Sequence, residues 1–181
     1  MPLPPLGVFA RPLVATSFES IATVGVYDNS SVYTLTFSSI PSTYKHLQIR
    51  GQTNNGSGTG TQYGLIQFNS DTGNNYSYHI LEGNGSSASA SATTSTSSIK
   101  ISKQNDTTDI FSIPIVDILD YTNTNKYKTV RTLSGYEESA QGVQFISGLW
   151  QSTSAISTIT IKLDTGKFGK YTQYALYGIK G

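Results

Sequence analysis

The sequence contains no cysteine among its 181 residues. This absence excludes a disulfide framework, a thiolate metal site and a cysteine nucleophile, and it makes the chain indifferent to the redox state of its surroundings. Charged residues are also scarce, at 13% of the chain, and the net charge is +1. A nearly neutral chain lacks the electric field that holds nucleic acid or an anionic membrane. We therefore expect neither nucleic acid nor a membrane as a partner.

Long apolar runs are absent as well. No stretch approaches the roughly 20 apolar residues needed to cross a bilayer. The start of the chain, MPLPPLGVFARPLV, lacks the basic segment followed by an apolar segment that marks a secretory signal. A protein that acts outside the cell without such a signal has to leave by another route, such as lysis.

Residues 1–16 differ in composition from the rest of the chain. Four of the six prolines lie here, and they oppose regular strand or helix and favour an extended arm. Disordered tails are poorer in large apolar residues than this segment is, so we expect it to dock either on its own folded domain or on a partner. We predict an extended N-terminal assembly arm over 1–16 and one folded domain over 17–181. The contact residues expected in the arm are Leu3, Leu6, Val8, Phe9, Leu13 and Val14.

From Phe18 onward, apolar residues recur with a period of two. In the segment 156–163, for example, Ile159, Ile161 and Leu163 alternate with polar residues, and 32–37 and 45–50 show the same pattern. Such alternation predicts half-buried β-strands. The stretch IFSIPIVDIL contains Pro114, so its strand should be broken, bulged or at a sheet edge. Further strands are expected at 18–26, 62–69, 76–82, 97–101, 110–120, 127–137, 143–151 and 172–180.

Turn sequences separate almost every pair of these segments, as in DTGNN at 71–75 and DTGK at 164–167. No long helical pattern occurs, so we predict an all-β fold with less than about 10% helix. About ten or eleven strands fit an antiparallel β-sandwich, and a jelly-roll-like topology is the first choice. The run SSASASATTSTSS at 86–98 has no large side chain to bury, and we predict a mobile surface loop there.

The sequence offers no catalytic constellation. The G-x-S-x-G nucleophile elbow is absent, and His46 and His79 are the only histidines and are interpreted as solvated. Asp117 and Asp120 lie close together, but three residues apart on a strand they face opposite sides, which does not suit a glycosidase. Asp117 shares the parity of neighbouring isoleucines and is interpreted as a buried, hydrogen-bonded carboxylate. We expect no enzyme activity, no catalytic residue and no cofactor.

Metal sites are equally poorly supported. Two histidines without cysteine cannot form the usual zinc sites. Calcium takes oxygen ligands, and Asp71 is the best single candidate, with Asn69, Asn74 and Asn75 nearby. Aspartate before Thr-Gly is also common turn chemistry, so we expect no metal.

Basic and aromatic residues have simpler interpretations. Lys126, Lys128 and Arg131 alternate along a strand and are expected to form a solvated face. Trp150 has apolar neighbours and is expected in the core or an interface. Tyrosines near predicted turns offer a platform for sugar stacking, although tyrosine is also favoured in any strand. The tyrosines concerned are Tyr76, Tyr78, Tyr121, Tyr127 and Tyr136.

Several segments together span nearly all of the chain after residue 16. They are SFESIATV at 17–24, FSSIPSTYKHLQIRG at 37–51, FNSDTGNNYSYHILEGNGSS at 68–87, VDILDYTNTNKYKTVRTLSGY at 116–136, SGLWQSTSAISTITI at 147–161 and YALYGIKG at 174–181. Together these segments resemble a family of bacteriophage virion proteins. The resemblance implies a β-rich module on the particle surface, either a tail fibre or tip subunit or a capsid decoration (cement) subunit.

The resemblance also implies other virion proteins as partners, and a homotrimer is favoured because appendage and decoration proteins are commonly symmetric oligomers. We therefore predict a non-enzymatic virion surface structural protein that is attached through its N-terminal arm. One alternative is a binding module for a host receptor, either glycan or protein. Another is a polysaccharide depolymerase, which would need two carboxylates facing each other across a groove.

Overall fold

A computed structural model of the protein describes residues 17–58, 60–104, 107, 109–136 and 141–181. These residues form twelve β-strands and no α-helix, which confirms the all-β prediction. No helix able to cross a membrane is therefore found among them. The predicted arm over 1–16, with its six contact residues, lies outside the described residues.

Every predicted segment overlaps one strand, and β6 is the strand that was not predicted. The strands are β1 (Phe18–Gly25), β2 (Thr34–Phe37), β3 (His46–Gln52), β4 (Gln62–Phe68), β5 (Tyr76–Gly83), β6 (Ala88–Thr96), β7 (Ile99–Gln104), β8 (Ile113–Leu119), β9 (Lys128–Tyr136), β10 (Gly142–Trp150), β11 (Ile159–Leu163) and β12 (Gln173–Ile179).

The strands form two antiparallel sheets that pack face to face. The large sheet has the order β1-β12-β3-β8-β9-β10-β5-β6, and the small sheet has the order β2-β11-β4-β7. Without β5, β6, β9 and β10, the remaining eight strands form two four-stranded sheets, and every connection along the chain crosses between the sheets except the one from β4 to β7. That arrangement is a jelly roll, so the predicted sandwich is confirmed.

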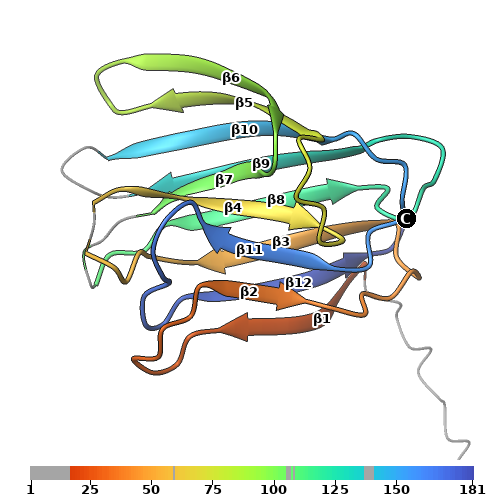
Figure 1. Cartoon of the computed structure of the whole chain (residues 1–181), viewed down its shortest axis with the longest axis horizontal. Helices are drawn as coiled ribbons and strands as arrows, with labels where there is room; N and C mark the ends of the chain where they lie inside the picture. The colour runs from red at the N-terminus through yellow and green to blue at the C-terminus, as the bar shows by residue number, and fades with distance from the viewer. Residues whose placement is uncertain (1–16, 59, 105–106, 108, 137–140) are drawn as a thin grey trace, which may run out of the picture.

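Two hairpins are inserted into this jelly roll. β5–β6 lies between β4 and β7 in the chain, β9–β10 lies between β8 and β11, and their four strands are consecutive in the large sheet. We call these four strands the extension, and β1, β12, β3 and β8 the jelly-roll part of the large sheet. In Figure 1 the small sheet lies across the jelly-roll part and, through β7, across β9, while β5 and β6 stand beyond it.

The core fills the space between the sheets. Leu47 and Ile49 of β3, and Ile159 and Ile161 of β11, are fully buried, as their alternation predicts. At one end of the core, the ring of Trp150 lies 5.5 Å from that of Phe68 and 6.2 Å from that of Tyr76. Of the two predicted locations for Trp150, core or interface, the structure shows the core.

The prediction of a mobile loop at 86–98 is wrong, because 88–96 forms β6. A two-residue turn starts the strand: the amide of Asn84 donates to the carbonyl of Ser87, and Gly85 has a φ of 85°. The Asn84 side chain also accepts hydrogen bonds from the amides of Ser86 and Ser87. Pairing with the edge of β5, rather than side-chain burial, orders this segment.

Pro114 lies in an interior strand, so the edge alternative is excluded. Pairing between β3 and β8 stops at Arg50–Ile115 and resumes with Thr53–Ser112 in the same register. The interval places Pro114 opposite Gly51, where a missing amide hydrogen interrupts the ladder without a bulge. The strand itself runs unbroken from Ile113 to Leu119, so none of the three predicted alternatives holds, and only the hydrogen-bond ladder to β3 is interrupted at Pro114.

The interpretation of Lys128 as solvated is also wrong. Its side chain is fully buried, and its ammonium donates to the carbonyls of Asn123, Lys126 and Thr153 at 2.7, 3.1 and 3.0 Å. Lys128 points to the inner side of β9, because strand parity places it with Val130. Burial lowers the pKa of this amine, and the nearby charge of Lys126 lowers it further.

Candidate assembly surface

The outer face of the large sheet, which points away from the small sheet, is not uniformly polar. On β8, Val116 and Ile118 point inward and are buried, whereas Ile113 and Ile115 point outward and are 61% and 41% exposed. Asp117 shares the outward parity and is only partly buried, so the prediction of a buried carboxylate is wrong. It is nevertheless hydrogen-bonded, since it accepts from Gln48 at 2.8 Å and from Arg131 at 2.9 Å.

Strand register places apolar side chains side by side across the outer face. Ile115 pairs with Leu133, Leu133 with Phe145, Phe145 with Leu81, and Leu81 with Ala90. We call this set of residues the apolar row, which crosses β8, β9, β10, β5 and β6. Leu133, Phe145 and Leu81 are 51%, 45% and 56% exposed. Contiguous exposed apolar surface of this kind marks interaction sites in soluble proteins.

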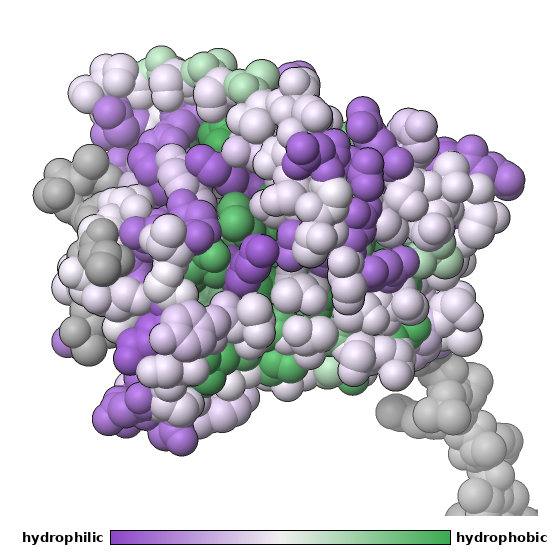
Figure 2. All heavy atoms as spheres, viewed as in Figure 1, coloured by the Kyte–Doolittle hydropathy of each residue, from purple (hydrophilic) through white to green (hydrophobic). Residues whose placement is uncertain are grey.

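A second line of residues widens the patch. Ile113 pairs with Gly135, Gly135 with Val143, and Val143 with Gly83. Val143 is 56% exposed, and the two glycines add no polar group to the surface. The opposite side of the molecule, which carries the small sheet, shows mainly hydrophilic and neutral residues in Figure 2.

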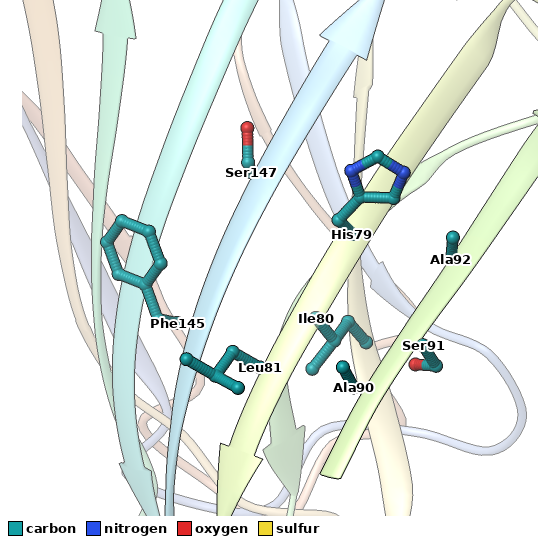
Figure 3. Close-up of a pocket in the computed structure, with 8 residues that line it drawn as sticks. All are labelled: His79, Ile80, Leu81, Ala90, Ser91, Ala92, Phe145 and Ser147. Carbon is teal, nitrogen blue, oxygen red and sulfur yellow. The ribbon is translucent and has the colours of Figure 1, made fainter.

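A shallow groove of about 550 Å³ lies between β10, β5 and β6 on this face. Figure 3 shows Phe145 and Leu81 close together on neighbouring strands, with Ala90 beyond them on β6. His79 of β5 is exposed and lies next to Ser147, its pairing partner on β10. The placement of His79 on an exposed strand position agrees with the interpretation of this histidine as solvated.

The jelly-roll part of the outer face has a different character. Arg50 donates to Gln48 at 2.8 Å, and its guanidinium lies 5.8 Å and 5.5 Å from the ring centres of Phe18 and Tyr177. Gln48 in turn donates to Asp117. The polar side chains here are therefore engaged with one another, and the guanidinium of Arg50 lies within cation–π range of both rings.

A partly buried polar network holds β5 to the small sheet. The carboxylate of Glu82 accepts from Lys103 of β7, Tyr136 and Gln144, each at 2.7 Å. Burial raises the pKa of Glu82, but hydrogen bonds from these three partners outweigh burial, so the pKa lies below its usual value. This network joins three strands of the extension, β5, β9 and β10, to β7 at the edge of the small sheet.

The carboxylates considered for chemistry have structural partners. Asp71 accepts hydrogen bonds from the indole of Trp150 at 2.7 Å, the amide of Gly73 at 2.9 Å and the Asn75 side chain at 3.0 Å. Its oxygens therefore serve the turn, which agrees with the turn interpretation. Asp120 pairs with Lys45 at 3.1 Å and with Lys126. Within the described residues, no group of three or more His, Asp or Glu is arranged to hold a metal.

His46 is not simply solvated. Its side chain is 30% exposed, and its Nδ1 accepts a hydrogen bond from the amide of Asp120 at 2.9 Å. The imidazole therefore joins β3 to the end of β8, which is a structural role. His79 lies several strands away in the large sheet, so the two histidines do not share a site.

Most of the tyrosines considered as a sugar platform lie in the core, which contradicts that option for them. Tyr127 is the exception, with 50% exposure. Sequence reasoning missed Tyr27, Tyr33 and Tyr171, which are 64%, 59% and 56% exposed. The buried ones are Tyr76, Tyr78, Tyr121 and Tyr136.

Tyr171 lies beside a second, more polar pocket of about 350 Å³. Its φ of 68° is rare for a large side chain, and two hydrogen bonds hold its backbone, from its amide to Val26 and from Gln52 to its carbonyl. Asn29, Asp109 and Lys170 also line this pocket.

Comparisons of the chain with protein-family models, curated proteins and solved structures gave no match. The function of the outer face is therefore inferred from its own geometry. The sequence signal for this face was present in IFSIPIVDIL, where apolar residues occupy both strand parities and thus both faces of the sheet.

Proposed function

We propose that the protein is a non-enzymatic structural subunit of a bacteriophage virion surface, and that its copies contact one another through the extension. The apolar row carries this proposal, since it exposes large side chains on consecutive strands of one sheet. Exposed aromatic and aliphatic side chains at the centre of such a patch are typical anchors of protein interfaces. The setting on a phage particle is favoured by the resemblance of the sequence.

Charge also favours a second copy as the partner of this face. The apolar row and the line through Ile113 and Val143 contain no charged residue, so two copies of the extension meet there without repulsion. The N-terminal arm, through Leu3, Leu6, Val8, Phe9, Leu13 and Val14, is proposed as a further attachment to other virion proteins. Both tail fibre or tip and capsid decoration remain open as locations.

The test of this proposal is antibody labelling of intact particles, followed by electron microscopy. Label over the shell identifies a decoration subunit, and label at the tail identifies a fibre or tip subunit. Particles from lysates that contain the protein but carry no label at either place would contradict the proposal.

Receptor binding is a second candidate, and the pocket beside Tyr171 favours it. An exposed tyrosine in a constrained backbone conformation, next to amide and charged side chains, suits stacking and hydrogen bonding to a sugar. A glycan array probed with the protein tests this function. Binding that is lost in Tyr171→Ala but kept in Tyr33→Ala supports it, and the absence of any binding contradicts it.

A further inference from the structure

Edge strands are where a sheet can pair with another chain, and natural proteins usually block them with charges, prolines, bulges or short length. Of the four edges in the described sheets, β1 has a bulge between Ser20 and Ala22 and an ion pair at Glu19. In the small sheet, β2 is only four residues long, and β7 has two lysines beside a register shift at Gly64. Three of the edges therefore have a protecting feature.

The fourth edge, β6, lacks these features over residues 88–93. In the described structure its residues 88–93 contain no charge or proline and pair with β5 in regular register. The register shift of this pair comes later, opposite Tyr76 and Tyr78. Alanine and serine alternate here, and residues 88–92 are exposed on both faces, because the hairpin extends beyond the small sheet (Figure 1).

The backbone of β6 presents its alanines to the free edge. The turn bond between Asn84 and Ser87 makes that pair a hydrogen-bonded one, and such pairs alternate along an antiparallel ladder. Ser89 and Ser91 therefore bond to β5. The amide and carbonyl groups of Ala88, Ala90 and Ala92 point away from β5, where the described sheet has no further strand.

We propose that β6 pairs antiparallel with β6 of a second copy, about a two-fold axis at Ala90. This inference rests on the proposed function, because it names one contact through which the extension joins copies. In this register Ala90 faces its own equivalent, and Ala88 faces Ala92 of the other copy. The two large sheets become one continuous sheet across the interface.

Self-pairing suits this strand better than pairing with a charged or bulky strand. The alanines of both copies lie on the outer face, so small side chains meet small side chains, and no charges are brought together. Ala90 also ends the apolar row, so pairing joins the rows of two copies into one. An isologous contact of this kind closes as a dimer, in contrast to the trimer that the resemblance implies.

The absence of cysteine makes a cross-linking test unambiguous. Facing residues in a hydrogen-bonded pair have Cα atoms about 5.5 Å apart, within the range that a disulfide bridges. Mild oxidation of Ala90→Cys should therefore give a covalent dimer. Ala88→Cys is the matched control, because its equivalent lies four residues along the strand, roughly 14 Å away, and should not cross-link.

A proline substitution tests the same contact by mass. Ala90→Pro removes an amide that points to the free edge and leaves the bonds to β5 in place, whereas Ser91→Pro removes a bond within the hairpin. By sedimentation, the unmodified protein should form at least the β6-linked dimer, and Ala90→Pro should weaken that dimer at least tenfold, with an unchanged thermal midpoint at concentrations where both proteins are monomeric.

A monomeric unmodified protein, or a dimer unaffected by Ala90→Pro, would overturn the pairing. So would a trimer that the variant leaves intact. None of these three outcomes affects the labelling of particles, so failure of the pairing is distinguishable from failure of the virion assignment, and only the monomer also contradicts contact between copies through the extension. A further outcome is that the unmodified protein and Ala90→Pro are both monomers, but only the variant is lost from particles. In that case the edge of β6 pairs with a strand of another protein, and the second-copy assignment is wrong.

Discussion

The jelly-roll part and the extension have the same backbone structure but differ in their outward side chains. In the jelly-roll part, outward side chains such as Arg50, Gln48 and Asp117 bond to one another, and among its described residues exposed isoleucines occur only on β8, next to the extension. In the extension, outward positions such as Leu133 and Phe145 are apolar and exposed. A jelly roll closes its core with eight strands, so the inserted hairpins are free to carry a surface that the fold itself does not require.

The inward side chains show the reverse difference in polarity, because they are more polar in the extension than in the jelly-roll part. β3 buries Leu47 and Ile49, whereas β9 buries Lys128, Thr132 and Ser134. The extension is thus apolar outside and partly polar inside. Its stability should therefore depend on buried hydrogen bonds to a greater degree than that of the jelly-roll part.

The largest expected effect follows from removing the buried ammonium of the extension. Lys128→Met leaves three buried carbonyls without their donor, and we expect the free energy of unfolding to fall by about 3 kcal/mol. Urea denaturation measures this. Lys126→Met is the control, since that lysine is 52% exposed and should contribute less than about 1 kcal/mol. Equal losses in both variants would mean that Lys128 has no special role.

A smaller effect is expected at the junction between the extension and the small sheet. Glu82→Gln removes the counter-charge of Lys103 in a mostly buried network and should lower the free energy of unfolding by about 2 kcal/mol. Amide hydrogen exchange should show faster opening of β5 and β6 than of β3 and β12. Uniform acceleration across both halves of the large sheet would contradict the role of Glu82 as a local clamp.

The sequence predicted strands with one apolar face better than it predicted the apolar row, and the reason is physical. Alternation identifies a strand and its buried face when one face is apolar, as Ile159, Ile161 and Leu163 show. On β8, apolar residues lie on both faces, so alternation could not tell that Ile115 is exposed. The register that aligns the apolar row depends on pairing between distant segments, which no local pattern contains.

Two further features could not be predicted for related reasons. β6 has no apolar pattern, because backbone pairing with β5 orders it. Lys128 lies among residues that look solvated, and its burial depends on carbonyls brought together from Asn123 and Thr153. In both cases the deciding groups belong to the backbone, whose placement the side-chain sequence does not encode directly.

A pH effect is expected to fall on the jelly-roll part. Hydrogen bonds from Lys126 and then Lys45 lower the pKa of Asp120 to about 2, below its ordinary value of 3.8. A lowered carboxylate pKa stabilises the fold above the unfolded pKa, and that stabilisation is lost as the pH falls from about 4 to about 2. Asp120→Asn should remove this part of the acid sensitivity in urea titrations. The effect should be small, since both lysines are more than half exposed.

The smallest effect on stability, with a clear effect on assembly, is expected at the centre of the apolar row. Phe145→Thr keeps a residue suited to a strand and changes a side chain that is 45% exposed, so the free energy of unfolding should change by about 0.5 kcal/mol. If the outer face joins copies, this variant should lose species larger than the β6-linked dimer in sedimentation. Tyr33→Thr removes an aromatic residue of similar exposure outside the large sheet and should leave those species unchanged. If Phe145→Thr leaves all oligomers intact and Ala90→Pro removes them, self-association takes place only at the edge strand β6. The proposed role of the outer face in joining copies would then be wrong.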